Sequence, residues 1–271
     1  MHHVRRPAVA GTFYPADPRE LQALVEEFTT GRVPAAAFGA IAPHAGLIYS
    51  GACAGKVYAR VEIPPLAVVL APNHTGMCSF PARAGYWGEG AFRIPLGESK
   101  VDNEFVQALG ESTDLVAEDR AQHMKEHAVE VQLPFLQLLA PETMIAPLVL
   151  PWDDWDRCKE LAAALAGVIS AWPTKVLLIA SSDMNHYESA ETALHKDTAV
   201  LEAVTKLDGE ELLGTCEKMH VTMCGRAPAA VLVETSHILG AEVATVVDYR
   251  HSGMVTGDES SVVSYAGVVV T

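Results

Sequence analysis

Two histidines follow two apolar runs in the same way, and they are the first candidates for chemistry. His44 comes near the end of FGAIAPHAG (38–46) and His74 ends LAVVLAPNH (66–74), and a proline closes each apolar run. Both runs predict buried strands. In an open α/β sheet, ligands bind in the crevice beyond the carboxyl ends of the strands. Because neutral imidazole is a common metal ligand, the pattern favours a site that contains both histidines over simple packing.

A metal site with two imidazoles needs at least one further ligand. A third apolar run, KVLLIA (175–180), leads directly into Asp183 and His186. Cys224 lies in TMCGRAP, just before a predicted helix whose start would lower the pKa of the thiol and favour a thiolate ligand. The same local sequence is equally consistent with Cys224 as a small buried residue. The candidates for the third ligand are Asp183, His186, His127 and Cys224.

The segment His123 to His127 has the form H-x-x-E-H. This is the form of an inverted zinc-protease motif, in which two histidines hold zinc and the glutamate activates water. So short a pattern arises often by chance, and no third ligand follows it, so zinc-dependent hydrolysis is the lesser hypothesis. Otherwise Glu126 and Glu130 are expected on a solvated helix face and His123 in a loop.

The elements that must position these residues alternate between strands and helices. This alternation predicts an α/β fold with a mostly parallel or mixed central sheet and helices on both faces. No internal repeat is found, so residues 1–271 are expected to form a single domain. A turn is predicted at 46–51, and loops with at most one hairpin at 75–97. Strands are predicted at 38–43, 66–74, 144–150, 175–180, 242–248 and 261–270, and helices at 17–30, 52–61, 101–109, 126–139, 156–171, 192–206 and 228–239.

Composition excludes several classes of protein. The formal net charge of −15 would repel phosphate backbones, so nucleic acid is not an expected partner. No apolar run approaches the roughly 18 residues that span a bilayer, and the N-terminal residues do not form a secretory signal, so a cytoplasmic protein without membrane contact is expected. The five cysteines contain no C-x-x-C pair, which argues against a disulfide framework or a zinc ribbon.

Six motifs occur in order along the chain: RRPAVAGTFYPADP, IAPHAGLIYSG, LAPNHTG, EHAVEVQLPFLQ, SSDMNHY and MCGRAP. They extend from the first ten residues into the C-terminal third. Together they resemble the Memo family, also called the AmmeMemoRadiSam system protein B family, and the resemblance covers nearly the whole chain.

The resemblance implies a fold similar to that of class III extradiol ring-cleaving dioxygenases, which are non-haem Fe(II) enzymes. It implies metal ligands at His44, His74 and Cys224, with Asp183 and His186 close by in the pocket. Those dioxygenases have a glutamate where this chain has Cys224. Because a thiolate is softer than a carboxylate, it favours Fe(II), copper or zinc over harder ions, and the departure argues against catechol cleavage.

The sequence therefore predicts a metal-binding redox protein or oxidoreductase that uses Fe(II), with copper or zinc as alternatives, in a cleft at the strand ends. Asp183, His186 and His127 are the expected catalytic residues, and Asp183 and His186 would move protons. The alternative is a non-catalytic module that binds a peptide or protein in the same cleft. The expected ligand is a small molecule or peptide, and family association suggests an AMMECR1-type protein and a radical SAM protein as partners.

Overall fold

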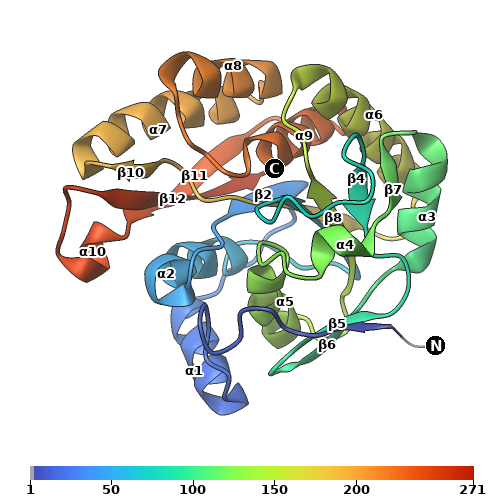
Figure 1. The fold of residues 1–271 in the computed structure, drawn as a ribbon, viewed down its shortest axis with the longest axis horizontal. Helices are drawn as coiled ribbons and strands as arrows, with labels where there is room; N and C mark the ends of the chain where they lie inside the picture. Colours follow the sequence, from blue (N-terminus) through green and yellow to red (C-terminus); the bar gives the residue numbers. More distant parts are fainter. Residues whose placement is uncertain (1–2) are drawn as a thin grey trace.

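A computed structural model describes residues 3–271 and is built around a nine-stranded mixed sheet (Figure 1). Four parallel strands form its centre, in the order β2, β9, β3, β8. Every residue of β2 and β3 is buried, which explains why these strands are continuous apolar runs rather than alternating ones. The four strands are β2 (Gly39–Ala42), β9 (Val176–Ser181), β3 (Leu66–Pro72) and β8 (Met144–Leu150).

Antiparallel strands extend both edges of this parallel centre. On one side β12 (Val262–Val270) pairs with β2, and β11 (Ala244–His251) and β10 (His186–Glu188) pair with β12. On the other side β4 (Ala84–Tyr86) pairs with β8, and β7 (Val116–Glu118) pairs with β4. A separate three-stranded sheet contains β1 (Val4–Arg5), β5 (Ala91–Ile94) and β6 (Gly97–Lys100).

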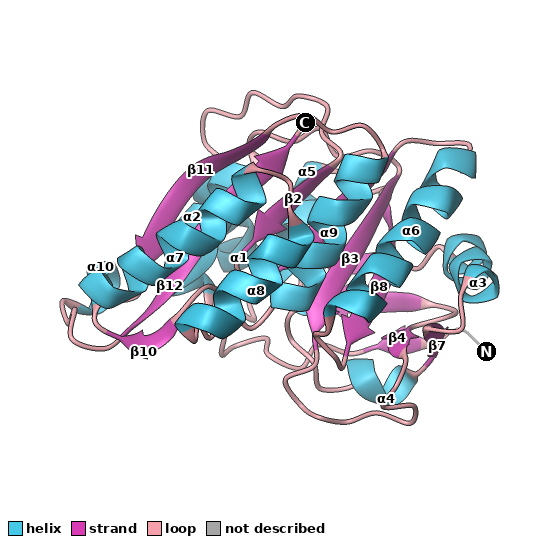
Figure 2. Ribbon diagram, turned by 90° about the horizontal axis from the view of Figure 1, so that it is seen from above, coloured by secondary structure: helices cyan, strands magenta, loops and turns pink. Residues whose placement is uncertain are grey.

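Helices cover both faces of the sheet (Figures 1 and 2). One face carries α6 (Trp155–Ala171), α7 (Ala190–Thr205), α8 (Gly209–Met219) and α9 (Arg226–Ile238), of which α9 contacts β2, β3 and β9. The other carries α1 (Pro18–Phe28), α2 (Leu47–Tyr58) and α5 (Leu133–Leu139). The remaining elements are α3 (Asn103–Ser112), α4 (Arg120–His123), the 3₁₀ helix η1 (Glu130–Gln132) and α10 (Gly253–Thr256).

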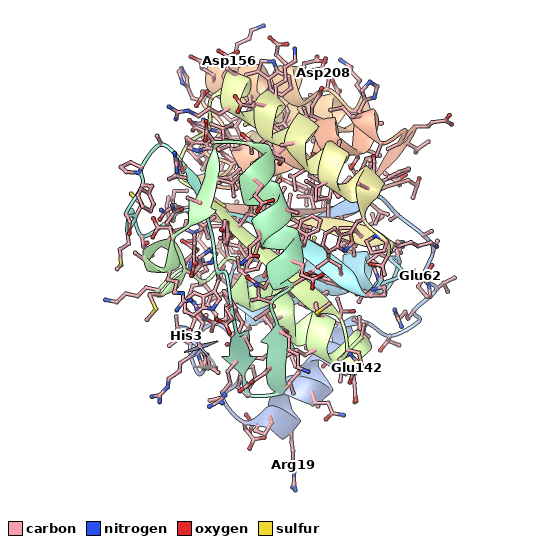
Figure 3. The ribbon with its side chains drawn as sticks, turned by 90° about the vertical axis from the view of Figure 1, so that its right-hand side faces the viewer. His3, Arg19, Glu62, Glu142, Asp156 and Asp208 are labelled. Carbon is pink, nitrogen blue, oxygen red and sulfur yellow. The ribbon has the colours of Figure 1, made fainter. Side chains whose placement is uncertain are left out.

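The predicted α/β class with a mixed sheet and helices on both faces is confirmed. Charged side chains lie on its periphery, as Figure 3 shows for five exposed residues on different elements and loops: Arg19, Glu62, Glu142, Asp156 and Asp208. Among residues 3–271, none of the helices combines the length and the apolar character needed to cross a membrane.

Two local predictions are wrong. The predicted turn at 46–51 is the first part of α2, which begins at Leu47. Gly51 is needed for close helix packing and not for a turn, because a Cβ at this position would lie 2.2 Å from the ring of Phe28. The predicted helix at 126–139 begins only at Leu133, after an irregular stretch and η1, and Pro134 lies in its first turn, where proline fits. In addition, α8 was not predicted.

Candidate metal centre

Strand order brings three of the predicted site residues to one edge of the sheet. β9 lies between β2 and β3, and all three are parallel, so their carboxyl ends meet there. His44 follows β2, His74 follows β3 and Asp183 follows β9. His127 reaches the same place from the stretch before η1, and Cys224 from the residues before α9. This is the crevice position expected for a ligand site in an α/β sheet.

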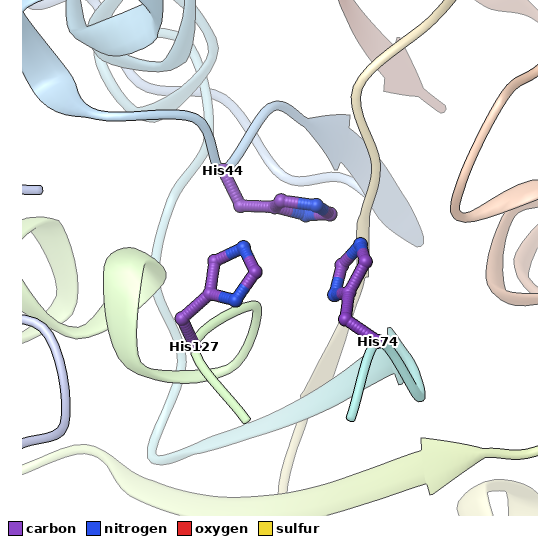
Figure 4. A group of neighbouring side chains, drawn as sticks. All are labelled: His44, His74 and His127. Atoms are coloured by element: carbon purple, nitrogen blue, oxygen red, sulfur yellow. The ribbon is translucent and has the colours of Figure 1, made fainter. Parts of the chain in front are cut away.

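Three imidazoles face one another at this edge (Figure 4). One nitrogen from each of His44, His74 and His127 lies within 4.8 Å of the others, and no other His, Cys, Asp or Glu group within residues 3–271 meets this test for a metal site. The ring centroids of His74 and His127 are 4.6 Å apart, and that of His44 lies 5.1 and 5.3 Å from them. We call these three residues the histidine cluster. His44 is buried, whereas His74 and His127 are partly exposed, which leaves the cluster open on one side.

The hydrogen bonds of Ser181 determine the tautomer of His44. The Ser181 hydroxyl donates to the carbonyl of Ala128 at 2.7 Å, so its oxygen can only accept from Nδ1 of His44, 2.9 Å away. Gln132 donates to the same oxygen. His44 therefore carries its proton on Nδ1, and the lone pair of Nε2 is free for a ligand.

Glu126 has the same effect on His74 and also lies close to His127. Its Oε1 accepts from Nδ1 of His74 at 2.9 Å and lies 3.4 Å from Nδ1 of His127. The carboxylate also accepts from the backbone N–H groups of His74, His127 and Ala128. A carboxylate behind a histidine is the usual orienting partner of a metal-binding imidazole.

These surroundings keep His44 and His127 neutral and the carboxylate of Glu126 charged. Burial, followed by the neighbouring His74, lowers the pKa of His44 to about 3, and burial, followed by His44, lowers that of His127 to about 4. Burial alone would raise the pKa of Glu126. The hydrogen bond and charge of His74, the backbone N–H of Ala128 and the neighbouring His127 together outweigh burial and lower this pKa to about 2. At neutral pH, unprotonated nitrogens therefore stand next to a negative charge, and this donor set fits a metal cation.

Cys224 and Asp183 lie on the His44 side of the cluster. The Cys224 sulfur is 3.3 Å from Nε2 of His44, and the backbone N–H of Asp183 donates to it at 3.3 Å. Nitrogen and sulfur ligands of one tetrahedral ion lie about 3.6 Å apart, so the contact with His44 suits a shared ion. Burial raises the pKa of the Cys224 thiol, and a bound cation would be needed to deprotonate it.

Two further predicted residues, Asp183 and His186, have well-defined partners. The Asp183 carboxylate accepts from the backbone N–H groups of His44 and Ala45, while burial raises its pKa. Nδ1 of His186 lies 3.0 Å from the carbonyl oxygen of Thr222, to which it donates, so Nε2 is the ring nitrogen that remains for another partner. Both residues flank the histidine cluster without belonging to it.

Two interpretations of the EHAVEVQLPF segment (126–135) are wrong. Glu126 and Glu130 were expected on a solvated helix face, and both are buried. Glu130 accepts from the side chains of Arg5 and Tyr14 and from two backbone N–H groups. Sequence reasoning therefore missed Glu126 as the residue that orients two histidines. Only its position beside His127 was a usable signal.

His123 was expected in a loop, and it is the buried last residue of α4. Its Nε2 lies 2.9 Å from the carbonyl of Gly85, and its ring packs among Trp87 and Phe92. The H-x-x-E-H segment therefore does not bring its two histidines to one ion, because His127 belongs to the histidine cluster, with Glu126 behind it, while His123 belongs to the core.

Comparison with known proteins gives matches over nearly the whole chain. The family model described as Memo-like protein matches residues 5–269. Curated relatives include MEMO1 family proteins of Aquifex aeolicus, 40% identical, and of Methanopyrus kandleri, 38% identical, each with 98% of both chains covered. A MEMO1 family protein of Aeropyrum pernix is 38% identical over 98% of this chain and 99% of its own.

Proposed function

The chain belongs to the Memo family, and from this premise we propose that it is a metal-dependent oxidoreductase. One ion, Fe(II) with copper as the alternative, is held by His44, His74 and Cys224. The observation that carries this proposal is the fixed tautomer of His44, which directs an unprotonated Nε2 toward the Cys224 sulfur 3.3 Å away. Zinc fits the same donors but supplies no redox chemistry.

The surrounding residues supply the remaining parts of such a site. His127 lies within the cluster as a neutral imidazole and can accept a proton from a bound molecule. Asp183, whose pKa is raised by burial, holds the backbone of His44 and can donate or accept a proton on the Cys224 side. His186 stands next to these groups, and its free ring nitrogen is suited to exchange protons with solvent. When bound, the metal supplies Lewis acidity and one-electron chemistry.

The ligand of this cleft is a small molecule in the proposal, and a peptide or protein bound without turnover is the competing function. The open side of the cluster at His74 and His127 admits either. An AMMECR1-type protein and a radical SAM protein remain proposed partners.

Metal content of variants tests the donor set. Protein purified without oxygen is expected to contain one ion per chain, and His44→Ala, His74→Ala and Cys224→Ala are each expected to reduce this to background. Elemental analysis measures it, with His237→Ala, an exposed residue of α9, as the matched control. Full metal content in all three variants contradicts the proposal.

The three-imidazole arrangement is a second donor set, favoured by the 4.8 Å grouping of His44, His74 and His127. A comparison of His127→Ala with Cys224→Ala separates the two sets. Loss of metal in Cys224→Ala with retention in His127→Ala supports the thiolate site. The reverse result assigns the ion to the histidines alone.

A further inference from the structure

A hollow opens beside Cys224, and none of the three histidines of the cluster lines it. It has a volume of about 530 Å³ and is lined by Thr222 and Cys224 and by four charged or titratable residues from α8 and its C-cap, from α9 and from the loop before α6: Asp153, Glu217, His220 and Arg226. A smaller hollow of about 200 Å³ shares Cys224 and Asp153 with it and reaches Asn73, the neighbour of His74. Cys224 therefore lies where both hollows meet the candidate metal centre.

Arg226 is the cation of the larger hollow, and its guanidinium is only partly used. Nε and Nη2 both donate to a single oxygen, Oδ2 of Asp153. No acceptor for Nη1 occurs in the part of the chain that the structure describes. A guanidinium matches a carboxylate best through two parallel N–H···O bonds, one to each oxygen, so the pair with Asp153 leaves part of this capacity unsatisfied.

Asp153 can also be readily displaced from Arg226 by another anion. The two side chains are 35% and 52% exposed, and exposed ion pairs contribute little to stability because solvent screens them. Glu217 and Asp153 are both acidic, so a free anion entering this hollow meets repulsion unless it takes the place of Asp153 on the guanidinium. The carboxylate of Asp153 thus occupies the position that a ligand's carboxylate would take.

The start of α9 makes the position more favourable for an anion. Arg226 is the first residue of this helix, and its N-cap Gly225 has no side chain to accept from the free N–H groups of the first turn. These groups and the positive end of the helix dipole lie next to the guanidinium.

We propose that Arg226 anchors a small organic carboxylate, which displaces Asp153 and extends along the hollow to Cys224. Only Gly225 separates Arg226 from Cys224, so their Cα atoms lie at most about 7 Å apart, and a small molecule can reach both side chains. That this molecule is the substrate rests on the proposed function. Its binding through Arg226 does not, because the anchor includes none of the metal ligands.

Binding of benzoate to the full-length chain tests the anchor, with the uncharged benzamide as the matched probe. Calorimetry is carried out on metal-loaded protein and again after chelation, so that a direct metal contact is separated from the arginine. Benzoate is expected to bind at least 10-fold more tightly than benzamide in both forms. Arg226→Gln is expected to remove this preference. Asp153→Asn, which frees the guanidinium, is expected to tighten benzoate binding several-fold.

Arg157→Gln is the control, because Arg157 and Asp154 form a comparable exposed pair on α6 outside this hollow, and benzoate binding should not change. Equal affinity for benzoate and benzamide, or unchanged binding in Arg226→Gln, overturns the proposal. Should Arg226→Gln fail to fold, Asp153→Asn decides alone, since weaker or unchanged binding there also overturns it. Failure of the metal proposal appears in metal content, which these variants leave untouched.

Discussion

Glu126 and Glu130 lie four residues apart, both are buried, and each accepts hydrogen bonds from four donors. Glu130 is paired with the guanidinium of Arg5 and with N-terminal residues, so its charge is balanced inside the protein. Glu126 instead contacts His74 and lies 3.4 Å from Nδ1 of His127, and no Arg or Lys side chain among the described residues pairs with it. The difference teaches that one carboxylate holds the fold together, whereas the other makes the histidine cluster attractive to a cation.

The largest expected effect is on folding, from Glu130→Gln. This change leaves the guanidinium of Arg5, only 1% exposed, without its counter-charge. Breaking a buried ion pair by removing one partner costs about 3–5 kcal/mol, so the free energy of unfolding should fall by about that amount. Chemical denaturation of metal-free protein measures it. Arg93→Gln, which breaks the more exposed pair with Glu98, should change stability by less than about 1 kcal/mol. Equal losses of stability in Glu130→Gln and Arg93→Gln would show that the buried pair stabilises the fold no more than the exposed one.

The second effect is on metal binding, from Glu126→Gln. The amide cannot accept from all the donors around it, so the Nδ1 proton of His74 loses its orienting charge and the nearby His127 loses a neighbouring negative charge. Loss of such a partner lowers metal affinity by about 10–100-fold. Competition with a chelator measures this affinity. Glu130→Gln serves as the comparison, and its folded fraction should keep wild-type affinity. An equal loss of metal affinity in Glu126→Gln and Glu130→Gln would show that Glu126 has no special role at the histidine cluster.

The smallest expected effect is on the pH dependence of the free energy of unfolding. It tests His123, a buried residue whose carbonyl accepts from Arg5, the partner of Glu130. Burial lowers the pKa of His123 from its usual value to about 4, with its hydrogen bond to Gly85 acting in the opposite direction. As pH falls, the unfolded chain therefore takes up the proton first, near pH 6.5, and the folded chain only near pH 4, so stability is lost across that window. Between pH 6.5 and 5.5 this loss is about 1 kcal/mol for one histidine.

His123→Gln should reduce the pH dependence by that amount, because glutamine does not titrate and its amide can donate to the carbonyl of Gly85. Denaturation of metal-free wild type and variant at both pH values gives the difference. The other low-pKa histidines, His44 and His127, contribute equally to both proteins and cancel. Identical pH dependence in the two proteins would show that His123 does not titrate as described.

The strand ends were predictable from the sequence because they depend on local pattern. Continuous apolar runs identified the central strands, and the residue after each run gave His44, His74 and Asp183. Glu126 and Glu130 were not predictable in the same way. Their partners lie 52 residues away at His74 and 125 residues away at Arg5, so a four-residue spacing gave only the appearance of a solvated helix face. The N-terminal turn of α2 was hidden because glycine at position 51 suggested a turn, whereas it is required by Phe28 on another helix.

The bond between Arg5 and Glu130 also has a consequence for synthesis on the ribosome. Arg5 is made 125 residues before its partner, which corresponds to about 6–25 s at about 5–20 residues per second. Until then its guanidinium lacks this carboxylate, and its two other acceptors, the carbonyls of His123 and Glu126, are made only a few residues earlier. The N–H groups of Ala8 and Val9 also have no native acceptor before Glu130 is made, because both donate to its carboxylate. The segment from Arg5 to Val9 therefore cannot complete its native hydrogen bonds until residue 130 has been translated.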